Sequence, residues 1–166
     1  MRAQRSGIII TLSSVSGYSP QPGASIFAAS KHALEGFGTS LGPELAPFNI
    51  RVALVEAGML RTNFCNHAVF PAKRLSEPYE GGVVQQAQAL VEFCRRSPEE
   101  FTICLEKLGR RVVEFVDGTG VFREVKERGL QRLILDEDAM MVWKRQLEVL
   151  TENVVAMEGI AENADL

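Results

Sequence analysis

Two short apolar stretches decide the fold of this chain: residues 7–14, which read GIIITLSS, and residues 50–56, which read IRVALVE. Such runs, rich in β-branched residues and bounded by small or polar ones, are typical of strands buried on both faces of a parallel sheet. Between them, residues 24–46 carry apolar side chains at helical spacing, and Pro47 ends the pattern. The order strand, helix, strand predicts a βαβ unit with two parallel neighbouring strands.

The rest of the sequence predicts more helices and one further strand. Helical patterning covers residues 83–94, and Ser97 begins a capping-box sequence that predicts a helix starting directly after it and ending near Val116. Residues 130–135 form a third apolar run of strand length, and Asp136 is placed to cap a final helix. The whole chain therefore reads as a single α/β domain.

Composition excludes several classes of protein. The chain has 166 residues, of which 46% are hydrophobic and 23% charged, with a net charge of −3. These values are typical of an ordinary globular domain, which excludes disordered, collagen-like and coiled-coil proteins. No clustered basic excess indicates a nucleic-acid partner. No apolar run reaches the roughly 18 residues of a membrane span, so no membrane contact is expected.

The N-terminus and the cysteines indicate a cytoplasmic protein. Arg2 and Arg5 precede an apolar stretch that faintly resembles a signal peptide, but the stretch is shorter than the ~7–15 residues required, and we interpret it as a strand. The chain has three cysteines, an odd number without Cys-x-x-Cys spacing: Cys65, Cys94 and Cys104. We expect free thiols in a reducing compartment.

One pair of residues stands out as a candidate site before any family is considered. Ser14 lies at the carboxyl end of the first strand, the edge where open α/β sheets bind their ligands. Lys31 follows Phe27 by four residues in the predicted helix, so that both lie on one face. Lys31 could hold an anionic or hydroxyl-bearing ligand, or its ammonium could simply be solvated at the helix surface.

Residues 7–64 resemble the second half of the short-chain dehydrogenase/reductase family. GIIITLSSVSG resembles the strand that carries the family's catalytic serine, and FAASK at 27–31 resembles its Tyr-x-x-x-Lys helix. IRVALVEAGMLRT at 50–62 resembles the next strand and its Pro-Gly-x-x-x-Thr cofactor loop. Ser14 stands 13 residues before Phe27, as the family's serine stands before its tyrosine. RTNF and RLILDEDA look specifically like NADP-dependent fungal members.

The resemblance implies the fold in more detail. We expect a partial Rossmann-like, doubly wound parallel sheet that comprises the last three strands of the family's domain. Residues 1–64 would form the strand–helix–strand core, residues 65–129 a helical substrate lid, and residues 130–166 the last strand and the C-terminal helix. The family's Gly-rich phosphate-binding turn, its first four strands and its catalytic asparagine are not found before Ser14, which implies a truncated domain.

The resemblance also implies roles for individual residues. Ser14 would hydrogen-bond a substrate carbonyl, and Lys31 would hold the nicotinamide ribose of NADP. Gly58, Leu60 and Thr62 would contact the cofactor near its nicotinamide. The substrate would be a small carbonyl or secondary alcohol of lipid or secondary-metabolite type.

One departure from the family pattern concerns catalysis. Phe27 stands where the family has its catalytic tyrosine, so no hydroxyl is present there to act as an acid. Tyr18, in the loop after Ser14, would contact substrate or replace the missing acid. A milder departure is Ala57, which replaces the proline of the family's cofactor loop.

A pair of glycines and a pair of histidines predict no ligand site. Gly118 and Gly120 follow a predicted helix and read as a turn, since a dinucleotide fingerprint must follow a strand. His32 and His67 have no carboxylate or cysteine at metal spacing, so no metal site is expected.

These observations leave several functions open. The first is an NADP-linked short-chain dehydrogenase/reductase, impaired by truncation and by Phe27. The second is a non-catalytic pseudoenzyme that binds a partner, and the third guides a reaction such as a cyclisation without acid–base chemistry. Because the 7–14 strand would have one bare apolar edge, we expect a homo-oligomer or association with a full-length relative.

Overall fold

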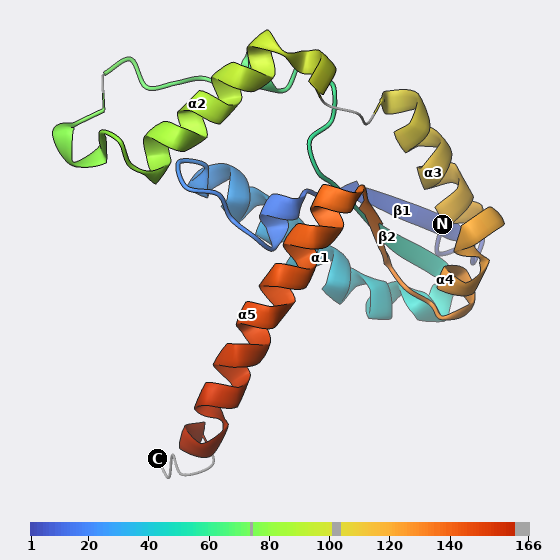
Figure 1. Ribbon diagram of the computed structural model, residues 1–166. Coiled ribbons are helices and arrows are strands. Elements are labelled where there is room, and N and C mark those ends of the chain that lie inside the picture. The colour runs from blue at the N-terminus through green and yellow to red at the C-terminus, as the bar shows by residue number, and fades with distance from the viewer. Residues whose placement is uncertain (74, 101–103, 162–166) are drawn as a thin grey trace.

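The computed structural model describes residues 1–73, 75–100 and 104–161, and its centre is a three-stranded parallel sheet (Figure 1). The strands lie in the order β1 (Gly7–Leu12), β2 (Ile50–Ala57) and β3 (Arg132–Leu135). β1 pairs with β2 in parallel, and β2 pairs with β3 in parallel. The sheet predicted from the three apolar runs is confirmed.

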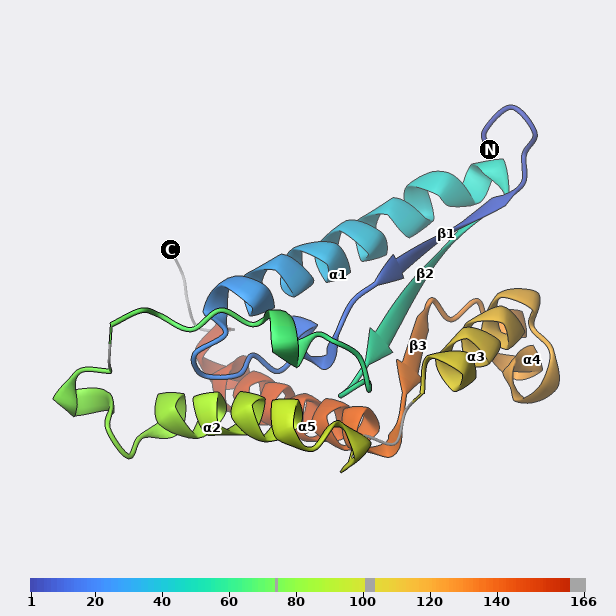
Figure 2. The ribbon, with the colours of Figure 1, turned by 90° about the horizontal axis from the view of Figure 1, so that it is seen from above.

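The described residues also form five α-helices: α1 (Ser25–Leu45), α2 (Val83–Arg96), α3 (Leu105–Asp117), α4 (Arg123–Glu127) and α5 (Glu137–Ala161). Helix α1 lies on one side of the sheet, and α3 and α4 lie on the other (Figure 2). Helix α5 starts beside the carboxyl end of β3 and then extends away from the sheet (Figure 1). This arrangement confirms the predicted α/β class.

Helix α1 approaches the sheet closely because part of its inner face has almost no side chains. A Cβ added to Gly38 would lie only 2.6 Å from Cδ2 of Leu54 in the central strand. Ala28 and Leu45 are buried on the same face, whereas Phe37 is 58% exposed. The apolar spacing therefore predicts the helix correctly but does not reveal its buried face, which uses small residues.

The main core lies between the sheet and helix α3. Phe115 of α3 is 1% exposed and packs with Ala53, Val55, Leu133 and Leu135 of the two strands β2 and β3. The ring of Phe115 also meets Phe122 edge to face, with 5.8 Å between their centroids. Part of the predicted lid segment is thus an integral piece of the core.

The structure corrects the prediction of a helix directly after Ser97. A single 3-10 turn follows at Pro98–Glu100, and α3 begins only at Leu105. Ser97 instead ends α2, because its N–H bonds to the carbonyl of Phe93. Cys104 has extended backbone angles, φ −87° and ψ 152°, so the two helical pieces are separate. The part of this prediction that falls on residues 101–103 lies outside the described residues.

Helix α4 was not predicted from the sequence. It is short, and Lys126 donates from Nζ to the carbonyl of Asp117 at 2.8 Å, which ties the helix back to the end of α3.

In the described part of the chain, no helix combines the length and the apolar character needed to cross a membrane.

Replacing Phe115 with Ala should lower the free energy of unfolding by about 3–5 kcal/mol, because the change removes a buried aromatic side chain and leaves a cavity. Val113 lies on the exposed side of the same helix and serves as the matched control. Val113→Ala should change the stability by about 0.5 kcal/mol or less. Urea denaturation measures both, and equal effects would contradict the placement of α3 in the core.

Candidate functional site

Ser14 lies where the polypeptide leaves the carboxyl end of β1. It caps the short 3-10 helix η1 (Val15–Gly17), and its side chain accepts a hydrogen bond from the N–H of Ser16 at 3.3 Å. The N–H of Ser13 donates to the carbonyl of Val55 at 2.8 Å, which holds this loop beside the end of β2. The predicted position of Ser14 after the carboxyl end of a parallel strand is therefore found, and its contact with a ligand stays a prediction.

The loop that carries Ser14 lies directly against helix α1. A Cβ on Gly17 would stand 2.9 Å from Cγ of Glu35 and 3.3 Å from the carbonyl oxygen of Lys31, so only glycine fits without displacement. Lys31 in turn donates from Nζ to the carbonyl of Leu12 at 3.0 Å. These two contacts bring the Ser14 loop and the turn of Lys31 together.

Phe27 lies one helical turn before Lys31 and keeps an aromatic ring near the ammonium. The Nζ atom of Lys31 is 5.5 Å from the centroid of the Phe27 ring, within the range of a cation–π contact. The ring of Phe64 packs against the ring of Phe27, with 5.4 Å between the two centroids. The phenyl ring can pack and can face a cation, but it has no proton to transfer.

The loop after β2 is fixed by a single carboxylate. Asp136 accepts from the N–H of Gly58 at 3.2 Å with one oxygen, and with the other from the N–H of Ala139 in the first turn of α5. A Cβ on Gly58 would stand 2.5 Å from the carboxylate, so a side chain there is excluded. Burial raises the pKa of Asp136, while the two N–H donors act in the opposite direction. The predicted helix cap thus also anchors the candidate cofactor loop.

The other two residues predicted to contact cofactor lie further along this loop. Leu60 is half-buried, and Thr62 is exposed, with its hydroxyl accepting from the N–H of Phe64 at 3.2 Å. Thr62 lines a cavity of about 250 Å³ that also includes Arg61 and Cys65. Their contact with cofactor stays a prediction.

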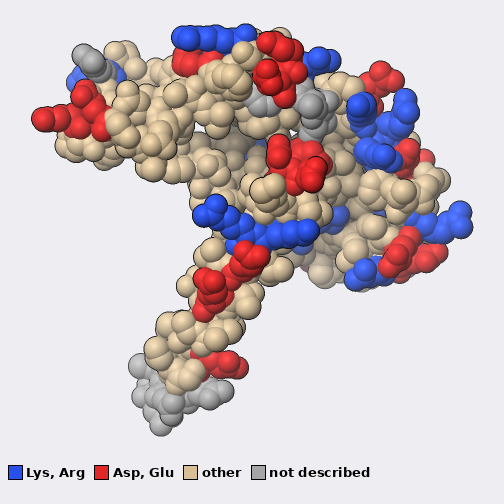
Figure 3. All heavy atoms as spheres, in the orientation of Figure 1, with Lys and Arg blue, Asp and Glu red and all other residues tan. Residues whose placement is uncertain are grey.

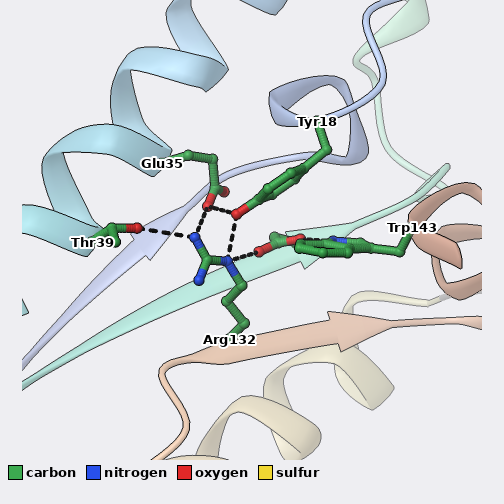
Figure 4. A network of polar contacts seen from close by, with 6 residues as sticks. Tyr18, Glu35, Thr39, Arg132 and Trp143 are labelled. Atoms are coloured by element: carbon green, nitrogen blue, oxygen red, sulfur yellow. Dashed lines mark hydrogen bonds and ion pairs between the residues drawn. The ribbon is translucent and has the colours of Figure 1, made fainter. Parts of the chain in front are cut away.

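Tyr18 is occupied by protein contacts. Its hydroxyl donates to Oε2 of Glu35 at 2.8 Å and accepts from Nε of Arg132, while its ring lies 4.1 Å from that of Trp143 (Figure 4). Burial and the hydrogen bond to Glu35 raise the pKa of Tyr18 well above its usual range. This geometry favours a role in positioning the Ser14 loop over the predicted roles of substrate contact or replacement acid.

Arg132 is the centre of a partly buried polar network. Its Nη2 donates to Oγ1 of Thr39 at 2.9 Å and lies 3.4 Å from Oε2 of Glu35 (Figure 4). Its Nε forms an ion pair with Oε1 of Glu56 at 3.2 Å. Trp143 of α5 donates from its indole N–H to the other oxygen of Glu56. The network joins α1, β2, β3, the Ser14 loop and α5.

The network contains two carboxylates for one guanidinium. Glu56 is 0% exposed, and burial raises its pKa to about 7, helped by the nearby charge of Glu35 and opposed by Trp143 and Arg132. Oε1 of Glu35 and the hydroxyl of Ser13 are buried without a hydrogen-bond partner in the structure. A proton on Glu56 makes the three charged groups neutral as a set, which lowers the cost of burying them.

Sequence reasoning missed this network, although one signal for it was present. Glu56 is a charged residue inside a strand predicted to be buried on both faces, and a buried charge requires a partner. Glu35 likewise falls on the same helix face as Ala28, seven residues earlier. The partner Arg132 lies 76 residues beyond Glu56, and only the folded sheet brings them together.

The two histidines, for which no metal site is expected, lie apart from this network. His32 contacts the carbonyl of Ala28 through Nδ1 at 2.9 Å, and His67 is exposed in the 3-10 helix η3 (Cys65–His67). Within the described ranges, no group of three or more His, Cys, Asp or Glu side chains could hold a metal ion.

Comparison with known proteins finds a similarity to one family. Residues 1–70 match the family model described as short chain dehydrogenase. In this part the chain resembles the short-chain dehydrogenases. A short-chain dehydrogenase of known structure from Streptomyces avermitilis superposes with a TM-score of 0.78 and 25% sequence identity, over 99% of this chain and 55% of that one. The predicted family resemblance and Rossmann-like fold class are confirmed.

Curated proteins that are similar to this chain include proteins of fungi and bacteria. Oxidoreductase BOA17 of Botryotinia fuckeliana is 36% identical over 90 residues, which cover 54% of this chain and 32% of that protein. The 3-ketodihydrosphingosine reductase of Bacteroides thetaiotaomicron is 40% identical over 67 residues, which cover 40% of this chain and 25% of that protein. The chain thus spans a quarter to a third of the length of these relatives.

The protonation of Glu56 should make stability depend on pH. Its pKa is about 7 in the folded protein, against an ordinary value near 4.5 for an exposed glutamate. The stabilisation from its bound proton is fully present below the lower value and is lost as the pH rises through the higher one. The free energy of unfolding should therefore fall between about pH 5 and about pH 8 by more in the parent chain than in Glu56→Gln.

Urea denaturation at several pH values measures this difference. Glu148→Gln is the matched control, since Glu148 is exposed on helix α5. The control should keep the pH dependence of the parent chain. Parallel stability profiles for the parent chain and Glu56→Gln would show that Glu56 keeps an ordinary pKa.

Proposed function

We propose that this chain carries the substrate side of a short-chain dehydrogenase/reductase site, which performs NADP-linked chemistry on a carbonyl or secondary alcohol. The observation that carries the proposal is the grouping of Ser14, Lys31 and the loop after β2 at the carboxyl edge of one parallel sheet. Open α/β sheets bind their ligands at this edge. The oxidoreductase names of the relatives support the same reaction class.

In this proposal Ser14 binds the substrate and Lys31 binds the cofactor. The partly exposed Ser14 hydroxyl would donate a hydrogen bond to the substrate carbonyl and stabilise the charge that develops on its oxygen. Lys31 uses one ammonium hydrogen for the carbonyl of Leu12, and a lysine has three, so two remain for ribose hydroxyls. These residues fit the nicotinamide ribose. When bound, the cofactor supplies the hydride.

Phe27 limits the rate of the proposed reaction. It lies beside Lys31, where the family has a tyrosine that transfers the proton, and a phenyl ring cannot do so. General acid–base catalysis contributes about 10²–10⁴-fold to a rate. We therefore propose an impaired reductase, whose slow reaction draws its proton from water.

The substrate class and the location are also part of the proposal. One relative is named for a sphingolipid ketone, which supports a substrate of lipid or secondary-metabolite type. A cavity of about 720 Å³ beside α2, lined by Phe70, Pro71 and Leu75 among others, offers apolar contact for such a molecule. The three cysteines are free thiols, which supports a reducing compartment such as the cytoplasm.

Titration of the purified chain with NADPH, followed by nicotinamide fluorescence, tests the proposal. We expect saturable binding that weakens at least about tenfold in Lys31→Met, because the change removes a charged hydrogen-bond donor worth ~1.5–3 kcal/mol. Lys144→Met, an exposed lysine of α5, should bind as the parent chain does. NADH serves as the second ligand and should bind more weakly. No saturable signal with either nucleotide would overturn the proposal.

Phe27→Tyr tests the cause of the impairment. Restoring the hydroxyl should raise NADPH-dependent reduction of an aromatic or aliphatic ketone by about 10²–10⁴-fold without changing NADPH binding. Phe64→Tyr places a hydroxyl on the neighbouring ring and is the matched control, with no expected gain. Normal NADPH binding without faster reduction would show that the missing proton is not the limiting factor.

A second candidate function is partner binding without catalysis. Among the described residues β1 pairs only with β2, and its side chains Ile10 and Leu12 are 41% and 60% exposed. Phe37 adds an exposed ring on α1. On the face seen in Figure 3, basic and acidic groups are interspersed, while much of α2 and of the far half of α5 is uncharged. Such apolar surface favours a homo-oligomer or association with a full-length relative.

Light scattering after size exclusion tests this second function. We expect a species heavier than the 18.3 kDa chain, and Phe37→Glu should reduce its mass toward that value. Ser40→Glu, three residues further along the same exposed side of α1, serves as the charge control. A clean 18.3 kDa species of the parent chain would contradict self-association.

A further inference from the structure

Two of the three cysteines lie next to each other, although 29 positions separate them in the sequence. Cys65 belongs to η3, directly after the candidate cofactor loop, and Cys94 belongs to the last turn of α2. Both are buried and line one small cavity, where burial and then the neighbouring thiol of Cys65 raise the pKa of Cys94. Cys104, the third cysteine, is half-buried, lies outside α2 and η3, and does not line the cavity described below.

The neighbouring Arg95 holds the two segments together. Its Nε donates to the carbonyl of Cys65 at 2.8 Å, and its Nη2 donates to the carbonyl of Ala68. Its guanidinium also lies 4.7 Å from the ring centroid of Phe70. Because Arg95 follows Cys94 in the helix, these bonds fix the backbone on either side of the thiol pair.

The thiol pair is reachable from outside through a small cavity. Cys65 and Cys94 both line the space of about 250 Å³ that also contains Arg61, Thr62 and Arg95. This volume is several times the roughly 30 Å³ that one water molecule takes up in the liquid. A small, uncharged oxidant that is similar in size to a water molecule can therefore enter the cavity.

We propose that Cys65 and Cys94 are a redox-sensitive pair that a peroxide converts reversibly to a disulfide. In the first step the thiolate of Cys65 attacks hydrogen peroxide, whose O–O bond breaks to give a sulfenic acid and hydroxide. In the second step the sulfur of Cys94 attacks that sulfenic acid, the S–S bond forms and water leaves. Two thiols and one peroxide become one disulfide and two waters, and a dithiol reverses the change.

We assign different roles to the two sulfurs. Burial and the neighbouring Cys65 thiol raise the pKa of Cys94 to about 11, so Cys94 retains its proton. Because the thiolate is the nucleophile, we assign the first attack to Cys65. Cys94 is the resolving thiol.

The disulfide would change the region between the two cysteines. It would close residues 65–94 into a covalent loop, and that loop contains all residues that line the 720 Å³ cavity, from Phe70 to Glu92. The bond would thus tether α2 to the end of the candidate cofactor loop. This proposal goes beyond the proposed function and does not depend on it.

The test exposes the reduced, folded chain to hydrogen peroxide and then blocks free thiols with N-ethylmaleimide. We expect an intact mass lower by two hydrogens, one maleimide adduct in place of three, and a peptide map that joins Cys65 to Cys94. Cys104→Ser should form the same disulfide. In Cys94→Ser, dimedone should trap a sulfenic acid on Cys65, whereas Cys65→Ser should give no dimedone adduct on Cys94.

A repeat of the oxidation in denaturant makes the result specific to the fold. There the selective pairing should disappear, because Cys104 becomes equally available. The proposal is overturned if the folded chain keeps three reactive thiols, pairs Cys104 with either partner, or forms disulfides between chains. It is also overturned if the denatured chain gives the Cys65–Cys94 bond with the same selectivity.

Discussion

The guanidinium of Arg132 holds together the charged groups between helix α1 and the sheet. It lies between the buried carboxylates of Glu35 and Glu56, and each of these charges would be strongly unfavourable in the core without it. Removing one partner from such a buried set costs more than the pair contributes, because the remaining charge stays buried. Through Tyr18 and Trp143 the same group fixes the loop of Ser14 and the start of α5.

Close packing against two glycines is the second constraint on the candidate site. Helix α1 meets the sheet at Gly38, and the Ser14 loop meets α1 at Gly17, each without room for a side chain. The close fit at Gly17 therefore sets how the Ser14 loop lies against the turn of Lys31. Phe27 keeps an aromatic ring beside Lys31, and this ring has no proton to transfer.

The sequence predicts the local part of this structure well. Apolar runs and helical spacing depend on neighbours within about ten residues, so the three strands, α1, α2 and α5 were expected near their observed bounds. The helix after Ser97 was placed too early, because a capping box does not specify whether the following backbone remains helical. Contacts at long range were not predictable: the Glu56–Arg132 pair and the Cys65–Cys94 pair depend on the folded chain.

Asp136 has a consequence for how this edge of the molecule can move. One of its oxygens ends the loop that starts at Gly58, and the other starts helix α5. A rotation of α5 about its axis would carry the carboxylate away from Gly58, and a shift of the loop would uncap the helix. The loop and the long C-terminal helix are therefore mechanically coupled, so that a load applied at the far end of α5 reaches the start of the loop through Asp136.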